Sequence, residues 1–125
     1  MRLKSQIDAS LAALNRRDFE ALMGLVDEDA ALDMPDGSRV IGAESIRNTL
    51  AAFILGRDIR FSDIVVMTGE ADLRGAAEVT LSAVVKAEPG EDEPEEGRVS
   101  LPAVFVFERD EGPFQRISLF CATPL

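Results

Sequence analysis

The spacing of apolar residues changes once along this chain, near residue 57. Before that point apolar residues recur at every third or fourth position, as they do on one face of an α-helix. Beyond it they recur at every second position, which is typical of half-buried β-strands. A chain with its helices first and its strands afterwards is expected to fold as α+β, with the helices on one face of an antiparallel sheet.

The first part of the chain predicts three helices and one short strand. An apolar face over 3–14 marks the first helix, and Asp18 is placed to cap the N-terminus of the second. A short strand is expected over 30–35, followed by a tight turn over 35–38 that is rich in turn-forming residues. A third helix is expected over 43–55, and the glycine after it suits a helix end.

The second part predicts strands joined by hairpins. The strands are expected over 58–68, 76–87, 98–108 and 114–121. Acidic or glycine-containing segments separate them, which predicts antiparallel pairing. The face turned away from the helices is expected to keep apolar residues, namely Ile64, Val66, Val84, Val104, Val106, Ile117 and Leu119. Because a monomer would leave this face in water, we expect a homodimer that joins two sheets through it.

Composition excludes several kinds of partner. The formal net charge of −10 argues against nucleic acid, whose backbone requires a basic surface. Much of the acidity lies in Glu88–Glu96, which is expected to form a solvated hairpin loop. No apolar run approaches the roughly 18 residues that span a membrane, and the N-terminus is unlike a secretory signal. We therefore expect one cytoplasmic domain over 1–125, with no membrane partner.

The chain contains no histidine, tyrosine or tryptophan. This excludes imidazole general bases, histidine-activated serine or cysteine nucleophiles, and the usual histidine-bearing zinc and iron sites. The single Cys121 allows no internal disulfide and no thiolate cluster, so we expect no metal and no cofactor. Any proton transfer must use an aspartate, a glutamate, a lysine, Cys121 or a water that they position.

One segment, LVDEDAALDMPDGS…IGAESIRNTLAAF, resembles the helix–strand–turn–helix pattern of the nuclear transport factor 2-like (NTF2-like) superfamily, which includes SnoaL-like polyketide cyclases and ketosteroid isomerase. The positions that carry the resemblance are Asp29, Pro35, Gly37, Gly42, Ile46 and Arg47. By element order it extends over nearly the whole chain. It implies the cone-shaped, cystatin-like α+β fold, in which three N-terminal helices pack on a curved, mostly antiparallel sheet and enclose a pocket.

The resemblance also indicates which chemistry is missing. Ketosteroid isomerase has an aspartate before the proline of its first strand, a tyrosine on its first helix and an acid on its penultimate strand. This chain has Met34 before the proline, no tyrosine, and Ala103 at about the third position. Asp33 does not replace the base, because a step of one residue turns a strand side chain to the opposite face. Steroid-type isomerisation is therefore not expected.

Asp63 and Asp33 remain as candidate catalytic groups, since a carboxylate buried in the cone would have a raised pKa and could transfer a proton. By analogy with the family's last strand, Arg116 should point inward and meet an anionic ligand or a carboxylate such as Asp33 or Asp63. The expected pocket wall consists of Met34, Phe53, Phe61, Met67, Ala103, Phe105, Phe107, Arg116, Ser118 and Phe120. The apolar members of this set suit a solid core equally well.

Three functions stay open. The first, which we favour because the acid–base positions are empty, is binding of a small apolar or acidic organic molecule without catalysis. The second is a cofactor-independent cyclase, isomerase or hydratase that uses Asp63 or Asp33 with Arg116 as an anion clamp. The third is a dimeric protein-interaction module. A deep cavity with a carboxylate inside favours the enzyme, and a filled cone favours the interaction module.

Overall fold

The structure is a computed structural model that describes residues 1–85 and 97–122. The predicted acidic loop Glu88–Glu96 lies outside the described residues. The elements, in chain order, are α1 (Leu3–Asn15), α2 (Phe19–Met23), β1 (Val26–Asp33), β2 (Arg39–Ile41), α3 (Ala43–Gly56), β3 (Arg60–Thr68), β4 (Arg74–Val85), β5 (Gly97–Arg109) and β6 (Phe114–Cys121). No helix among the described residues is long and apolar enough to cross a membrane.

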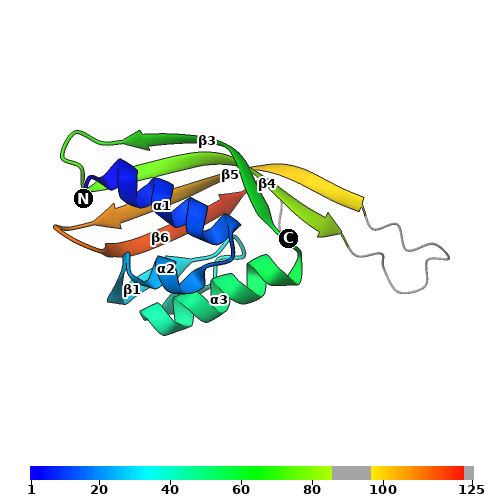
Figure 1. Ribbon diagram of the computed structural model, residues 1–125, viewed down its shortest axis with the longest axis horizontal. Coiled ribbons are helices and arrows are strands. Elements are labelled where there is room, and N and C mark those ends of the chain that lie inside the picture. Colours follow the sequence, from blue (N-terminus) through cyan, green and yellow to red (C-terminus); the bar gives the residue numbers. More distant parts are fainter. Residues whose placement is uncertain (86–96, 123–125) are drawn as a thin grey trace.

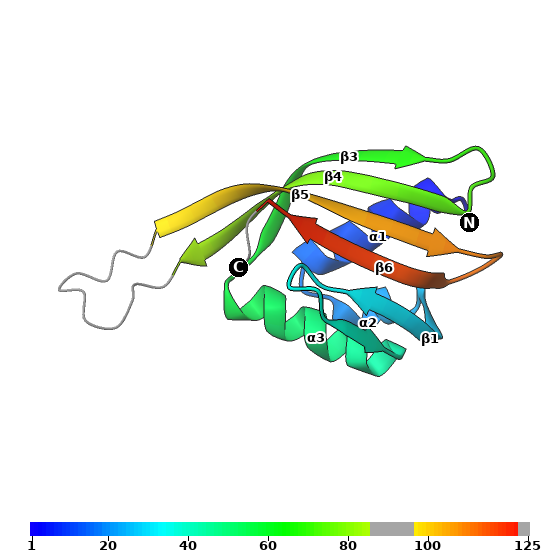
Figure 2. The same ribbon diagram turned by 180° about the vertical axis from the view of Figure 1, so that it is seen from behind.

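The strands form one curved six-stranded sheet in the order β2-β1-β6-β5-β4-β3. All neighbours pair antiparallel except β1 and β6, which run parallel. The helices lie on one side of the sheet, α1 against β3 and β4 and α3 against β1, while the other side is uncovered (Figures 1 and 2). The predicted α+β class, with three N-terminal helices on a mostly antiparallel sheet, is confirmed.

The helices form where the sequence predicts them. The apolar face of α1 is buried along its length, and α3 buries Ile46, Leu50 and Ile54. The Asp18 carboxylate accepts a hydrogen bond of 3.0 Å from the Ala21 amide, which caps α2. Strand β1 begins at Val26, earlier than predicted, because α2 is short and the chain then extends alongside β6.

A β-bulge in β3 changes which residues face the core. The β3–β4 register shifts by one residue between Ser62 and Val65, and Asp63 in this bulge has a φ of 51°. Phe61 and Val66 consequently pack on the core, whereas Val65 and Met67 lie on the uncovered face, 54% and 49% exposed. The predictions that Met67 points inward and Val66 outward are wrong, because one extra residue reverses the alternation.

A second bulge has the same effect in β6. Phe114 pairs with Arg109 and Arg116 with Glu108, so Gln115 is the extra residue. Beyond it Ile117 and Leu119 are buried against the core, at 2% and 1% exposure. Their side of β6 is therefore the helix-covered one, and Arg116, Ser118 and Phe120 lie on the other. The predicted orientation of this strand is wrong for all five residues.

The space between the helices and the sheet is filled by a row of phenylalanine rings. Phe61 meets Phe105 edge-on at a centroid distance of 5.1 Å, and Phe105 stacks on Phe107 at 5.8 Å. Phe107 in turn contacts Phe114 at 4.8 Å. All four side chains are at most 4% exposed. Offset and edge-on contacts of this kind are favourable beyond simple burial, so this row is a packed core.

Candidate functional site

Asp33 lies at the end of β1, where β2 and β6 bring basic and hydroxyl side chains to it. Its carboxylate accepts two hydrogen bonds from Arg39, at 2.5 and 2.9 Å, one of 2.9 Å from Arg116 Nε and one of 3.2 Å from Ser118 Oγ. The hydrogen bonds from Arg39, partly offset by burial and reinforced by Arg116, hold the pKa of Asp33 well below its usual range. A carboxylate in this state remains ionised and is a weak base.

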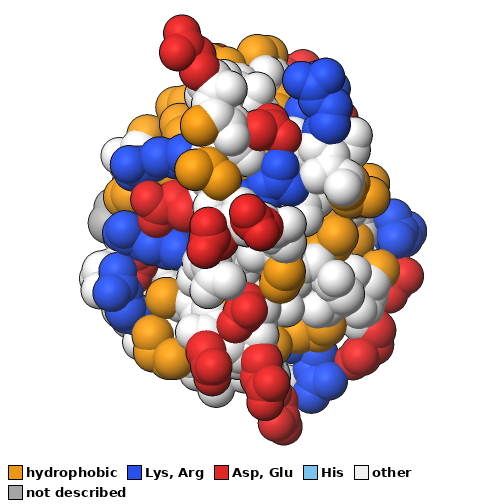
Figure 3. Space-filling model, turned by 90° about the vertical axis from the view of Figure 1, so that its left-hand side faces the viewer, with side chains coloured by type: hydrophobic (Ala, Val, Ile, Leu, Met, Phe, Trp, Pro, Cys, Tyr) orange, Lys and Arg blue, Asp and Glu red, His pale blue; other side chains and the backbone are white. Residues whose placement is uncertain are grey.

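This cluster stands on the uncovered face of the sheet, not inside the cone. Arg116 also donates to Glu108 at 3.4 Å, and Glu108 lies 3.5 Å from Arg74, so charges of both signs alternate across the strands. Figure 3 views the molecule from the end with the β3–β4 and β5–β6 turns, and shows basic side chains with acidic ones between them along its left edge. Arg116 therefore has the carboxylate partner that was one of its two predicted roles, but outside the cone.

The other expected site residues separate into three groups. Asp63 is exposed in the β3 bulge, where its left-handed backbone suits an aspartate. Phe61, Ala103, Phe105, Phe107 and Met34 are buried in the core, and Phe53 is partly buried against it. Met67 and Phe120 are exposed on the uncovered face. The structure thus brings the phenylalanines together and places both candidate aspartates away from them.

A cavity of about 510 Å³ opens where α1 ends and β3 begins. It is lined by Asn15, Arg17, Asp58, Arg60, Phe61 and Ser62. The Asn15 side chain positions one wall, because its amide nitrogen donates to the Phe61 carbonyl and its amide oxygen accepts from the Phe61 N–H, each at 2.9 Å. The amide thereby satisfies the backbone of β3, an edge strand of the sheet.

Arginines surround the one carboxylate in this lining. Asp58 Oδ1 accepts from Arg17 Nη2 at 2.8 Å, and Oδ2 accepts from Arg98 Nη2 at 2.5 Å. Arg60 approaches the same carboxylate at 3.6 Å. The hydrogen bond from Arg17 lowers the pKa of Asp58 against the opposing effect of desolvation, and the charges of Arg60 and Arg98 lower it further. We refer to Arg17, Asp58, Arg60 and Arg98 as the arginine cluster.

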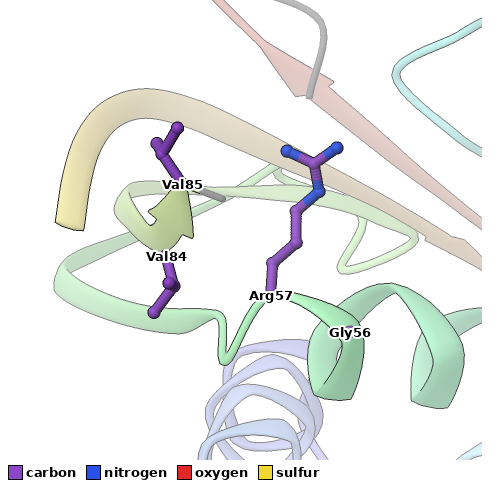
Figure 4. Close-up of a pocket in the computed structure, with 4 residues that line it drawn as sticks. All are labelled: Gly56, Arg57, Val84 and Val85. Atoms are coloured by element: carbon purple, nitrogen blue, oxygen red, sulfur yellow. The ribbon is translucent and has the colours of Figure 1, made fainter. Parts of the chain in front are cut away.

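A smaller cavity of about 230 Å³ lies at the same end of the molecule, lined by Gly56, Arg57, Val84 and Val85 (Figure 4). The Arg57 carbonyl accepts a hydrogen bond of 2.8 Å from the Val84 amide, which ties the end of α3 to β4. In Figure 4 the Arg57 guanidinium extends away from α3, toward the same side as Val85. Arg57 is thus a further basic residue, directly before Asp58 of the arginine cluster in the sequence.

Phe61 is the member of the expected pocket wall that lines this cavity. Four of the six lining residues lie in the segments 15–18 and 56–60, each of which carries arginine and aspartate next to the end of an apolar helix. This pattern, which the two segments share, is the feature of the sequence that could have indicated the cavity. It does not reveal that the two segments meet, because Arg17 and Asp58 are separated by 41 positions along the chain.

Comparison with known proteins agrees with this architecture. A candidate polyketide cyclase from Xanthomonas campestris pv. campestris superposes with a TM-score of 0.83 at 25% identity, over 95% of this chain and 89% of that one. A second one, from Pseudomonas putida KT2440, gives 0.81 at 26% identity, over 96% and 91%. An NTF2-like protein of unknown function from Cytophaga hutchinsonii gives 0.71 at 10% identity, over 97% and 90%, and shows the fold alone.

No curated protein matches the chain. The SnoaL-like domain, by contrast, matches residues 7–117, which is most of the sequence and includes every helix and strand in whole or in part. The expected NTF2-like resemblance is confirmed, because the domain, the element order and the superpositions agree. The chain belongs to the SnoaL-like domain family, and it shares its fold with the NTF2-like protein.

Proposed function

We propose that this SnoaL-like protein binds a small organic molecule in the cavity between α1 and β3, without ketosteroid-isomerase chemistry. The phenylalanine row fills the expected cone pocket, which by itself favours the interaction module, so the observation that carries the proposal is this other cavity at the edge of β3. Its volume of about 510 Å³ falls in the range of roughly 300–1,000 Å³ that is typical of small-molecule sites. It combines a core aromatic residue, Phe61, with polar groups from two turns, and such a combination can fix the orientation of a ligand.

The proposal excludes proton abstraction of the steroid-isomerase kind because no suitable base is in place. Met34 and Ala103 occupy two of the three catalytic positions, and the tyrosine of the third is missing from the sequence. Asp58, the carboxylate of the cavity, accepts hydrogen bonds from two arginines and has a lowered pKa. Asp33 is likewise held by arginines, Arg39 and Arg116.

A cyclase is the alternative that the similar proteins favour, since two of them are described as candidate polyketide cyclases. It differs from the proposal in needing a proton donor or acceptor next to the ligand. Asp63, one of the two candidate catalytic groups, is exposed and comes one residue after Ser62 of the cavity. Loss of a measured turnover in Asp63→Asn, with ligand binding retained, would support the cyclase.

The experiment that tests the proposal is a nuclear magnetic resonance titration of 15N-labelled protein with a panel of small aromatic acids and neutral aromatics. Binding in the cavity should shift the Phe61 and Ser62 amides and the Asn15 side-chain amide in a saturable manner. Ser62→Trp should abolish these shifts by filling the cavity, whereas Thr68→Trp, equally on the surface of β3, should not. A panel without any saturable shift at these groups would reject the proposal.

We also propose that the uncovered face of the sheet joins two copies of the chain. Phe120 and Val65 are each 54% exposed there, and Met67 is 49% exposed. Val104 pairs with Phe120 and Val106 lies in the next row, while Glu78 stands between Val65 and Val104, so the apolar side chains share this face with an acidic one. Burying these side chains against a second sheet would remove apolar surface from water.

A further inference from the structure

We infer that the arginine cluster binds an oxyanion of the ligand, a carboxylate or a phosphate. This inference rests on the proposed function and specifies the chemical class of its ligand. The cluster contains three guanidinium groups and one carboxylate, that of Asp58. The net charge of these four side chains is therefore positive. The whole chain, in contrast, has a formal net charge of −10. A cationic site in such a chain attracts anions locally.

The arginines retain donors for a ligand. A guanidinium has five N–H donors, and Arg17 uses two of its nitrogens, one toward the Leu14 carbonyl at 3.2 Å and one toward Asp58 at 2.8 Å. Arg60 is held more loosely, because its contact with Asp58 is 3.6 Å and its side chain is 68% exposed. The planar fork of an arginine matches the two oxygens of a carboxylate or phosphate.

Part of the site is rigid before any ligand arrives. Arg17 and Asp58 both have left-handed backbones, with φ of 65° and 46°, and their side chains are joined by the 2.8 Å ion pair. Arg98 fixes the other side of Asp58 through its carboxylate and, at 3.1 Å, through its backbone carbonyl. Each of the two residues follows the C-cap of a helix, Arg16 of α1 or Arg57 of α3, where a left-handed backbone commonly ends the helix. A fixed Arg17 would lose little freedom on binding.

The rest of the lining suits the organic part of the ligand. Ser62 is exposed and adds a hydroxyl at the rim, while Phe61 is 4% exposed and leaves only a small apolar contact. An oxyanion at Arg17 and Arg60 would place an attached ring or short chain over β3. Arg116, which the sequence suggested as the anion clamp, is already bonded to Asp33 and Glu108.

The test compares ligands that differ in charge alone. Benzoate and benzamide are titrated into the labelled protein, and phenyl phosphate is titrated separately to distinguish a carboxylate from a phosphate source. We expect benzoate or phenyl phosphate to bind at least tenfold more tightly than benzamide, with saturable shifts at Ser62 and at the Asn15 side chain. The stronger of the two anions identifies the preferred source.

Arg60→Gln and Arg74→Gln form a matched pair of variants. Each arginine is 68% exposed and lies near one carboxylate, Asp58 at 3.6 Å or Glu108 at 3.5 Å, but Arg74 is far from the cavity at the start of β4. Loss of a charge-assisted hydrogen bond should weaken anion binding roughly tenfold in Arg60→Gln. Arg74→Gln should leave the affinity unchanged, and Arg60→Lys should retain part of it because the charge remains.

The outcomes distinguish a failure of this inference alone from a failure of the proposed function as well. Equal affinity for benzoate and benzamide, with saturable shifts at Ser62, would overturn the oxyanion inference and leave the small-molecule function standing. An equal loss of anion affinity in Arg60→Gln and Arg74→Gln would also overturn it, because it would indicate a general charge effect. If no compound in the panel gives a saturable shift, the proposed function and the inference fail together.

Discussion

Arg109 donates two hydrogen bonds to Asp72, one from Nη2 to the carboxylate at 2.7 Å and one from Nε to the backbone carbonyl at 2.8 Å. The same carboxylate accepts from the Leu3 amide at 3.0 Å, and Arg109 also donates to Gln6 Oε1 and to the Met1 carbonyl, each at 2.7 Å. The pair therefore joins the start of α1, the β3–β4 turn and the end of β5. Arg109 is 10% exposed.

Replacing Arg109 with methionine should lower the free energy of unfolding by about 2–3 kcal/mol, because it leaves Asp72 and Gln6 without their shared donor. Urea denaturation measures the change. Arg74→Gln is the control, since its contact with Glu108 is exposed and such pairs contribute about 0–1 kcal/mol. Equal effects of the two substitutions would show that the Arg109 network adds nothing beyond a surface contact.

Asp33 should make the stability depend on pH in the acid range. Because folding lowers the pKa of Asp33, its charge stabilises the folded state at pH values above the unfolded pKa of about 3.9. This stabilisation is lost progressively as the pH falls from there toward the lower pKa of the folded state. Asp33→Asn should therefore reduce the free energy of unfolding by about 1–2 kcal/mol at pH 7. Urea denaturation from pH 7 down to about pH 3, which lies below the unfolded pKa, should show the difference shrinking on acidification.

Asp63→Asn serves as the control for that series, since Asp63 is exposed and asparagine also tolerates its left-handed backbone. The stability of this variant should follow that of the parent protein at every pH. A difference between Asp33→Asn and the parent that stays constant from neutral to acid pH would contradict a role for the Asp33 charge.

Asn15 should control the local stability of β3. Asn15→Ala removes both hydrogen bonds to the Phe61 backbone and should destabilise the fold by about 1–3 kcal/mol. Amide hydrogen exchange at Phe61 should accelerate by more than the global change explains. Asn48→Ala on α3 is the matched control, because Asn48 is exposed and its contact with Arg47 is a long 3.4 Å. Unchanged amide exchange at Phe61 in Asn15→Ala would show that the Asn15 side chain does not control the local stability of β3.

The proposed dimer predicts a mass near twice the 13.5 kDa of one chain, measured by light scattering during size-exclusion chromatography. Phe120→Glu should shift the protein to the monomer, because it would bury a charge in the apolar interface. Leu55→Glu should not, since Leu55 is 59% exposed but lies on α3, away from this face. A monomeric parent protein at micromolar concentration would contradict the proposal.

The fold was predictable because the apolar spacing survives in each element. The face of α1 over 3–14 and the cap at Asp18 need only neighbouring residues, and both are confirmed. The same reasoning failed for β3 and β6 because each has a bulge, at Asp63 and Gln115. A bulge adds one residue without changing the composition, so alternation read along the sequence assigns every later side chain to the wrong face.

The candidate site was less predictable for a different reason. Arg116 was assigned to the cone interior by analogy with the family's last strand, and its pairing with Asp33 joins residues 83 positions apart. The arginine cluster is likewise assembled from distant segments, with Asp58 and Arg98 separated by 40 positions. Contacts of this range follow from strand order and helix placement, which local periodicity does not specify.

The position of β6 in the sheet also constrains how the chain is made. Strand β6 lies between β1 and β5, and it is the last strand in the sequence. During synthesis the edge of β1 that pairs with β6 therefore stays unpaired until residues 114–121 have left the ribosome. Only then can the two parts of the sheet join. Pairing over such a sequence separation slows folding and exposes unpaired strand edges in the meantime. A nascent chain stopped before Phe114 would therefore lack the strand that closes its sheet.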